Sequence, residues 1–222
     1  MIIKRVQRKA KEWLGYKLWR ISVVRRLLAL AVPYCPLCRA LFNRSFIDLT
    51  KKTGWGVHPQ SMYLITHIVR QHRPQLIVDC GTGLGHSLAA ELCGILANGS
   101  GRIISLEHDA QYAPIAQAKF RGWNAASIVV VPLKANNAYD FEPDSPIDLL
   151  VVDGPPMALT DGRLNTIRHF MPFLSEKGAI LLDDLDREIE QQVVQTVVAE
   201  FGLQVEVIPE GHHMAILKKR QQ

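Results

Sequence analysis

The sequence has 222 residues, of which 48% are hydrophobic and 21% are charged, and its formal net charge is +5 at pH 7. This composition excludes a predominantly disordered chain, and the 15 Gly and 12 Pro follow no collagen-like period. The charge is unevenly distributed, because residues 1–44 carry +10 and the remaining residues carry −5. The basic character therefore belongs to the N-terminal segment and is no evidence for a basic groove elsewhere.

The N-terminal segment is predicted to be helical. Over residues 1–32, apolar side chains recur at steps of three and four with Lys and Arg between them, and Pro33 and Pro36 end the pattern. We therefore predict a basic helical region over residues 1–50 and a separate domain over residues 51–222.

The basic helical region has three candidate partners. It can pack on the domain or on a second copy of the chain, lie on an anionic membrane surface, or bind nucleic acid, which is the least favoured of the three. It contains no run of about 20 apolar residues, the length that a membrane span needs. Cys80 and Cys93 are expected to be buried, reduced thiols. We expect a cytoplasmic protein, with peripheral contact at the inner membrane surface left open.

The domain is predicted to alternate between strands and helices. A helix is predicted from Ser61, its N-cap, to His72. In the last helix, Asp186 is the expected N-cap, Ile189 faces inward and Gly202 ends the helix. The other periodic segments predict helices at 86–97, 110–121, 160–174 and 186–201. Apolar runs predict strands at 76–79, 102–106, 127–133, 147–152 and 178–182, and a final hairpin at 203–208 and 213–218. The fold class is therefore α/β, with a doubly wound, mostly parallel sheet that ends in an antiparallel hairpin.

A glycine-rich loop joins the first predicted strand to the following helix. Residues 79–87 have the sequence DCGTGLGHS. The glycines permit a tight turn and let a ligand approach the backbone, and the helix N-terminus offers N–H groups to an anion. Glu107 ends the next strand, where a carboxylate can accept both hydroxyls of a ribose. An adenosine-containing cofactor is expected. A nicotinamide cofactor is disfavoured because His86 replaces the third glycine of that fingerprint, and a ligand-free turn is the remaining alternative.

The spacing Asp79-x-Gly81-x-Gly83-x-Gly85 resembles motif I of the class I S-adenosylmethionine-dependent methyltransferases. The sequences IISLEHD at 103–109, DLLVVDGPP at 148–156 and GAILLDD at 178–184 resemble later strands of the same family. Together they are most similar to a bacterial group related to the catechol-type O-methyltransferases. The resemblance covers residues 55–218 and implies a Rossmann-like fold.

The resemblance implies a set of cofactor-binding residues. Ser87 would bond the methionine carboxylate, Glu107 the ribose, and His108 would flank the adenine, with Leu133 and Lys134 nearby. The full set implied for S-adenosylmethionine is Asp79, Gly81, Thr82, Gly83, Gly85, Ser87, Glu107, His108 and Asp153.

The same resemblance implies Asp153 as the catalytic residue and leaves a divalent metal open. Relatives hold such an ion with carboxylates at the ends of the fourth and fifth strands, which here are Asp153 and Asp184. The amide that usually follows the second acid is replaced by Leu185. Asp183 is expected to point to the opposite face of the strand.

Other side chains are candidates for a role in the chemistry. Without a metal, a histidine is an alternative base, although a structural role is more common for each candidate. Arg163 and Arg168 either hold an anionic acceptor or lie on a solvated helix face. The candidate histidines are His58, His86, His169 and His212.

We therefore expect a methyltransferase that acts on a small-molecule or saccharide-type hydroxyl. An N-methyltransferase and a non-catalytic, cofactor-binding partner protein are the alternatives, and a homo-oligomer is left open.

Overall fold

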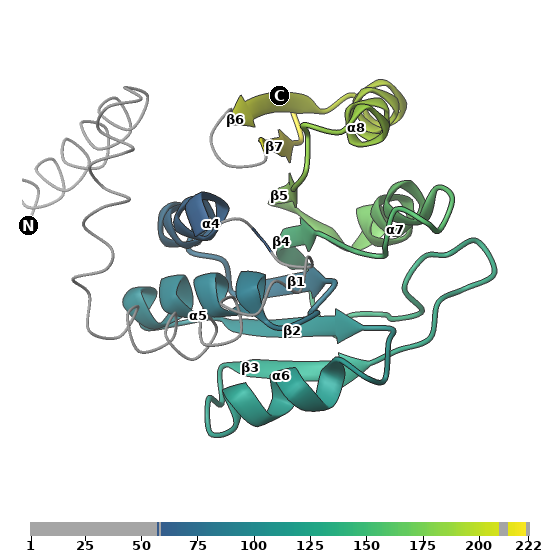
Figure 1. Cartoon of the computed structure of the whole chain (residues 1–222). Coiled ribbons are helices and arrows are strands. Elements are labelled where there is room, and N and C mark those ends of the chain that lie inside the picture. Colours follow the sequence, from purple (N-terminus) through teal and green to yellow (C-terminus); the bar gives the residue numbers. More distant parts are fainter. Residues whose placement is uncertain (1–56, 58, 209–212, 221–222) are drawn as a thin grey trace, which may run out of the picture. The chain divides into compact units, whose positions relative to one another are not determined.

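The computed structural model describes residue 57, residues 59–208 and residues 213–220 (Figure 1). The predicted basic region of residues 1–50 lies outside these described residues, as do His58 and His212. The expectations for that region and its boundary therefore stay predictions.

A seven-stranded sheet forms the centre of the domain, in the order β3-β2-β1-β4-β5-β7-β6 (Figure 1). Strands β1 to β5 are parallel, and β7 lies antiparallel to both β5 and β6. This confirms the predicted doubly wound sheet with an antiparallel hairpin at its end. The strands are β1 (Leu76–Cys80), β2 (Arg102–Glu107), β3 (Ala126–Val130), β4 (Ile147–Val152), β5 (Leu174–Leu182), β6 (Gln204–Ile208) and β7 (Met214–Lys218).

Helices cover both faces of the sheet. Figure 1 shows α4 and α5 on one side and α7 and α8 on the other. This arrangement explains why the central strands are apolar on both faces. The helices are α4 (Pro59–His72), α5 (His86–Asn98), α6 (Ala113–Phe120), α7 (Gly162–Phe170), which continues into the 3-10 helix η2 (Met171–Phe173), and α8 (Glu188–Phe201).

Strand β1 divides its side chains between the two faces. Val78 and Cys80 belong to a buried core cluster that also contains Ile167 and Phe170 of α7. Since side chains alternate along a strand, Asp79 points to the opposite face, where it contacts Ser87 of α5. The sheet thus holds one carboxylate against the start of α5.

Two helix starts differ from the sequence prediction. Helix α4 begins at Pro59, so Ser61 is not its N-cap. Helix α8 has Arg187 at its N-cap position instead of Asp186, and Ile189, expected to face inward, is 44% exposed. The C-terminus of α8 is as predicted, because Gly202 has a φ of 65° and its N–H donates to the carbonyl of Val198.

The two cysteines of the domain differ from each other. Cys80 is buried and free, as expected. Cys93 is disulfide-bonded, so the expectation of a reduced thiol is wrong at that position. No helix among the described residues has both the length and the apolar character needed to cross a membrane.

Candidate active site

The polar residues singled out in the sequence meet at one edge of the sheet. Strands β1, β2, β4 and β5 are parallel, so their carboxyl ends lie at the same edge. The chain reverses its direction of winding between β1 and β4, which is the position where ligands bind in open α/β sheets. Glu107 is the last residue of β2, and the glycine loop, Asp153 and Asp184 follow the ends of β1, β4 and β5.

The three glycines of the loop are required for different structural reasons. All have positive φ, with values of 107° at Gly81, 48° at Gly83 and 86° at Gly85. A Cβ at Gly81 would lie 2.7 Å from the backbone nitrogen of Gly154, and one at Gly85 would lie 2.5 Å from Cε2 of Phe120. A Cβ at Gly83 would meet nothing within 4 Å. The loop therefore packs tightly at two glycines and is open at the third.

Glu107 connects the glycine loop to the end of β2. The backbone N–H of Gly83 donates to its Oε2 over 2.7 Å, and that of Asp109 donates to its Oε1 over 2.9 Å. His108 Nδ1 lies 3.2 Å from Oε1, and the imidazole meets the ring of Tyr139 edge-on. Glu107 is buried, and these backbone hydrogen bonds fix its carboxylate beside Gly83, where the loop is open.

Asp79 supports the loop from beneath. Its buried carboxylate accepts hydrogen bonds from the hydroxyls of Ser105 over 2.5 Å and Ser87 over 3.3 Å. The hydroxyls of Thr82 and Ser105 lie 2.6 Å apart. Burial raises the pKa of Asp79 to about 6, against the lowering effect of the two serines, and Glu107 adds to the rise. The Ser87 hydroxyl is thus engaged with Asp79, and its contact with a methionine carboxylate stays a prediction.

The N-terminus of α5 carries no capping side chain. Gly85 occupies the N-cap position in a left-handed conformation, and no acidic residue lies in the first turn. The first N–H groups of a helix have no partner within the helix and attract an anion. This terminus can therefore receive a ligand carboxylate.

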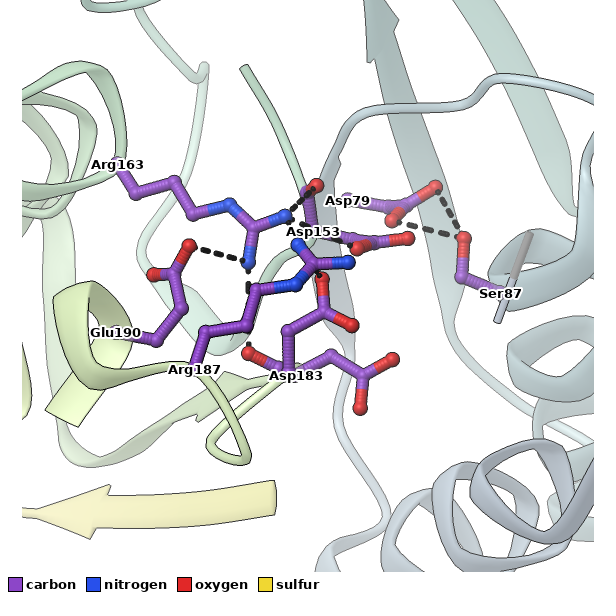
Figure 2. A network of polar contacts seen from close by, with 8 residues as sticks. Asp79, Ser87, Asp153, Arg163, Asp183, Arg187 and Glu190 are labelled. Carbon is purple, nitrogen blue, oxygen red and sulfur yellow. Dashed lines mark hydrogen bonds and ion pairs between the residues drawn. The ribbon is translucent and has the colours of Figure 1, made fainter. Parts of the chain in front are cut away.

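A network of carboxylates surrounds one arginine at the ends of β4 and β5 (Figure 2). The side chain of Arg163, on α7, is 7% exposed. Its Nη2 donates to the carbonyl of Asp153 over 2.6 Å and to Oδ2 of Asp184 over 3.2 Å, and its Nη1 lies 3.2 Å from Oε1 of Glu190. Nη1 also donates to the carbonyl of Asp183 over 3.4 Å. Three separate elements thus converge on one guanidinium.

Asp153 is the carboxylate of this network that a ligand can reach. Its side chain is 23% exposed, compared with 8% for Asp184 and 2% for Glu190. Burial raises the pKa of Asp153 well above its usual value; Arg163 opposes this shift, and Asp183 and Asp184 increase it. A raised pKa makes a carboxylate a better proton acceptor near neutral pH.

Among the described residues, four carboxylates meet two cations in this network. Asp153, Asp183, Asp184 and Glu190 lie around Arg163 and Arg187, whose Nη1 lies 2.7 Å from Oδ2 of Asp184. This arrangement favours a cationic ligand beside Asp153.

The expected metal ligands do not form a metal site. The guanidinium of Arg163 bridges Asp153 and Asp184, and a positive charge already occupies the space between the two carboxylates. Among the described residues, no group of three or more His, Cys, Asp or Glu side chains has a metal-binding arrangement. The donor set therefore does not fit a divalent ion at this place.

Asp183 and Asp184 do not follow the expected strand alternation. Strand β5 ends at Leu182, and Asp184 has a φ of 66°, so the regular alternation of side chains stops before both residues. Both are buried, and both raise the pKa of Asp153. The strand alternation on which the expectation for Asp183 rests therefore does not extend to these two residues.

The two other candidate histidines in the described residues, His169 and His86, lie in surroundings that favour a structural role. Nε2 of His169 lies 2.7 Å from the carbonyl of Phe141, which can only accept, so this nitrogen carries the proton. Its Nδ1 then accepts from Nζ of Lys134 over 3.3 Å. His86 is buried at the start of α5.

Arg168 and Lys134 have partners within the protein. The guanidinium of Arg168 pairs with both carboxylate oxygens of Glu200 on an exposed surface. This contact favours the solvated-helix interpretation of Arg168. Lys134 also lies 3.5 Å from a carboxylate oxygen of Asp140.

Two side chains of the site carry no local signal in the sequence. Tyr139, in the loop after β3, is fully buried, and its hydroxyl has no hydrogen-bond partner among the described residues. A Cβ at Gly154 would lie 2.5 Å from that hydroxyl. Glu190 reaches the network from α8. Both positions depend on contacts between distant segments, which spacing along the chain does not predict.

The sequence of the site region matches a known family. Residues 78–185 match a family model described as a methyltransferase domain. The matched range includes the glycine loop, Glu107, Asp153 and Asp184. Residues 78–185 are therefore similar to a methyltransferase domain, which agrees with the expected family and enzyme class.

Solved methyltransferases share the fold of this domain. An O-methyltransferase from Bacillus cereus in complex with SAH matches with a TM-score of 0.64 and 14% identity, over 87% of this chain and 97% of that one. The SAH-bound methyltransferase PaMTH1 from Podospora anserina gives 0.62 and 16%, over 82% and 88%.

A third structure, the O-methyltransferase TomG from Streptomyces achromogenes in complex with SAM, gives a TM-score of 0.58 and 14% identity, over 82% and 90% of the two chains. No curated protein matches the sequence.

Proposed function

We propose that the methyltransferase domain binds S-adenosylmethionine at the glycine loop and methylates a hydroxyl group of a small-molecule acceptor, including acceptors of the saccharide type. The observation that carries this proposal is the position of Asp153, a partly exposed carboxylate with a raised pKa beside the glycine loop. The solved relatives from Bacillus cereus and Streptomyces achromogenes, both O-methyltransferases, support the choice of an oxygen acceptor.

The residues of the loop fit the parts of this cofactor. Gly83 leaves open space on its outer side, so the cofactor can lie against the backbone. The uncapped N-terminus of α5 would receive the methionine carboxylate, and Glu107 would accept the ribose hydroxyls. The excess of carboxylates around Asp153 suits the positive sulfonium. His108 and Tyr139 would lie at the adenine side of Glu107.

When bound, S-adenosylmethionine supplies the methyl group in activated form. Asp153 holds the acceptor hydroxyl by a hydrogen bond and takes its proton while the acceptor oxygen bonds to the methyl carbon and the carbon–sulfur bond breaks. Arg163 fixes the position of Asp153 through its carbonyl and its carboxylate. No step in this proposal passes through a metal ion.

An amine acceptor needs this proton transfer less, because a neutral amine already carries an available lone pair. The raised pKa of Asp153 therefore favours oxygen over nitrogen as the acceptor atom. An N-methyltransferase and a cofactor-binding protein without turnover are the alternative outcomes of the experiment below.

The experiment incubates the full chain with S-adenosylmethionine that carries a ¹³C methyl group, together with phenols, sugars or amines. The chemical shift of the transferred methyl group in ¹³C NMR distinguishes oxygen from nitrogen attachment. We expect an O-methyl signal that is lost in Asp153→Asn and kept in the exposed control Asp186→Asn. An N-methyl product would contradict the proposal, and cofactor binding without any product would favour the non-catalytic alternative.

A further inference from the structure

We propose that Arg163 is a built-in counter-cation that takes the place of a divalent metal ion between the ends of β4 and β5, so that this domain transfers methyl groups without a metal. The consequence for turnover rests on the proposed function. The charge arrangement itself is tested without turnover.

The first argument is geometric. Arg163 Nη2 lies 3.4 Å from Oδ1 of Asp153 and 3.2 Å from Oδ2 of Asp184, so one nitrogen is shared by the carboxylates that follow two neighbouring strands. Nη1 and Nη2 also donate to the backbone carbonyls of Asp183 and Asp153. A bound ion would connect the same two strand ends through oxygen atoms. The guanidinium makes this connection with hydrogen bonds.

The second argument concerns charge. In the described part of the chain, Asp184 contacts the cations of Arg163 at 3.2 Å and Arg187 at 2.7 Å. A divalent ion at Asp184 would meet the repulsion of both. Arg163 keeps its charge at all physiological pH values, because the carboxylates of Asp153, Glu190 and Asp184 raise its pKa further despite its burial. The position between the carboxylates is therefore permanently occupied by positive charge.

The third argument is that the arginine is fixed. Its side chain is 7% exposed, and Glu190 on α8, which is 2% exposed, lies 3.2 Å from Nη1. A surface arginine can rotate away to admit an ion, whereas this one would leave a buried Glu190 without its partner. The cation is therefore part of the folded domain.

A fixed guanidinium and a metal ion differ in what they do to the acceptor. A metal ion lowers the pKa of a bound hydroxyl directly. The guanidinium of Arg163 contacts groups of the protein itself and not the acceptor hydroxyl. Asp153 alone therefore removes the proton. Arg163 is a positioning residue in this scheme.

The test is a titration with Mn²⁺, followed by the electron paramagnetic resonance signal of the free ion. Wild type and the charge-conserving Arg163→Lys should show no site that depends on Asp184. Arg163→Gln should bind one Mn²⁺ at least roughly tenfold more tightly than wild type, because the two carboxylates lose their cation. This gained site should vanish in Arg163→Gln/Asp184→Asn. Arg168→Gln is the matched control, since it removes an arginine from the same helix without touching the network.

Three results would overturn the proposal. The first is a Mn²⁺ site in wild type that Asp184→Asn removes. The second is a folded Arg163→Gln variant that gains no site. If Arg163→Gln does not fold, the wild-type titration decides together with the third result, a loss of wild-type turnover on exhaustive chelation that added Mg²⁺ restores. A chain that binds no S-adenosylmethionine would contradict the proposed function but leave the Mn²⁺ titration as a valid test.

Discussion

The carboxyl group of Asp79 is buried beneath the glycine loop, where two serine hydroxyls and, among the described residues, no cation are in hydrogen-bond contact with it. Its pKa is raised from 3.8 to about 6 in the folded state. An acid with a raised pKa favours the folded state while it is protonated. This contribution is complete below the unfolded pKa and is lost as the pH rises through about 6.

Replacing Asp79 with Asn should therefore stabilise the domain at neutral pH. A shift of this size corresponds to about 3 kcal/mol of unfolding free energy at pH 7.5, and the gain over wild type should disappear below pH ~4. Urea unfolding of both proteins across this pH range measures the difference. The exposed control Asp186→Asn should show little change, and a gain in Asp79→Asn that is independent of pH would contradict the assigned pKa.

The raised pKa of Asp153 predicts the pH dependence of turnover. The base must be ionised, so kcat should rise with pH and level off above the raised pKa, at a higher pH than for an ordinary aspartate. Asp153→Asn should lower kcat by about 10²- to 10⁴-fold and remove this inflection. Initial rates across the pH range provide the measurement. An unchanged inflection in Asp153→Asn would assign the base to another group.

The sequence predicted some of these residues better than others. Gly81, Gly83 and Glu107 belong to short motifs whose roles depend on neighbours a few residues away. The sequence indicates for Arg163 only an anion-binding or a solvated side chain, because its partners come from the ends of β4 and β5 and from α8. A contact made by three distant segments has no fixed spacing along the chain.

At the scale of single elements, the two ends of α5 differ in their proposed function. Gly83 lies in the loop before the helix and Gly99 at its C-cap, with φ values of 48° and 71°. An added Cβ would meet nothing within 4 Å at either position. The two glycines therefore carry the same backbone strain for an L-residue, and only one lies at the proposed cofactor site.

Ala substitutions at Gly83 and Gly99 form a matched pair. Each should lower the unfolding free energy by about 1 kcal/mol, because each forces an L-residue into a left-handed conformation. Only Gly83→Ala should weaken S-adenosylhomocysteine binding, by roughly tenfold or more, since its methyl group enters the space of the ligand. Thermal melting and calorimetry measure the two effects. Equal affinity in both variants would place the ligand elsewhere.

Element boundaries were predicted less well than the elements themselves. The N-cap of α8 moved from Asp186 to Arg187, whose N–H donates to the carbonyl of Asp184 and whose guanidinium pairs with that residue's carboxylate. Local capping preference is worth about 1 kcal/mol, and such a pair of tertiary contacts outweighs it. The apolar periodicity within the segment correctly predicted that a helix exists there, and only its first residue differs.

At the scale of the whole molecule, charge separates the chain into two parts. Residues 1–44 carry +10, whereas the rest carries −5. The proposed site lies in the acidic part, where a carboxylate excess suits a cationic methyl donor. We therefore propose that any contact with a membrane or a partner is made by the basic region.

If the basic region lies on a lipid surface, the chain should bind selectively to anionic membranes. The full chain should then co-sediment with phosphatidylserine-containing vesicles at low salt, and lose this binding in neutral vesicles or at high salt. Equal binding to both kinds of vesicle, or to neither, would favour packing on the domain or a second copy of the chain.

The overall topology was predictable because alternating apolar strands and helices permit few arrangements. The hairpin after α8 was visible as two apolar runs around a turn, and β7 indeed pairs with β5 in the antiparallel sense. The central account is that the glycine loop and Glu107 form the cofactor site of this domain.

Isothermal calorimetry with S-adenosylhomocysteine tests that account most directly. Wild type should bind one molecule, and Glu107→Ala should weaken binding by about 2 kcal/mol, the value of a hydrogen bond to a charged group. The exposed control Glu176→Ala should bind like wild type. The account would be contradicted if wild type bound no ligand, or if Glu107→Ala kept the wild-type affinity.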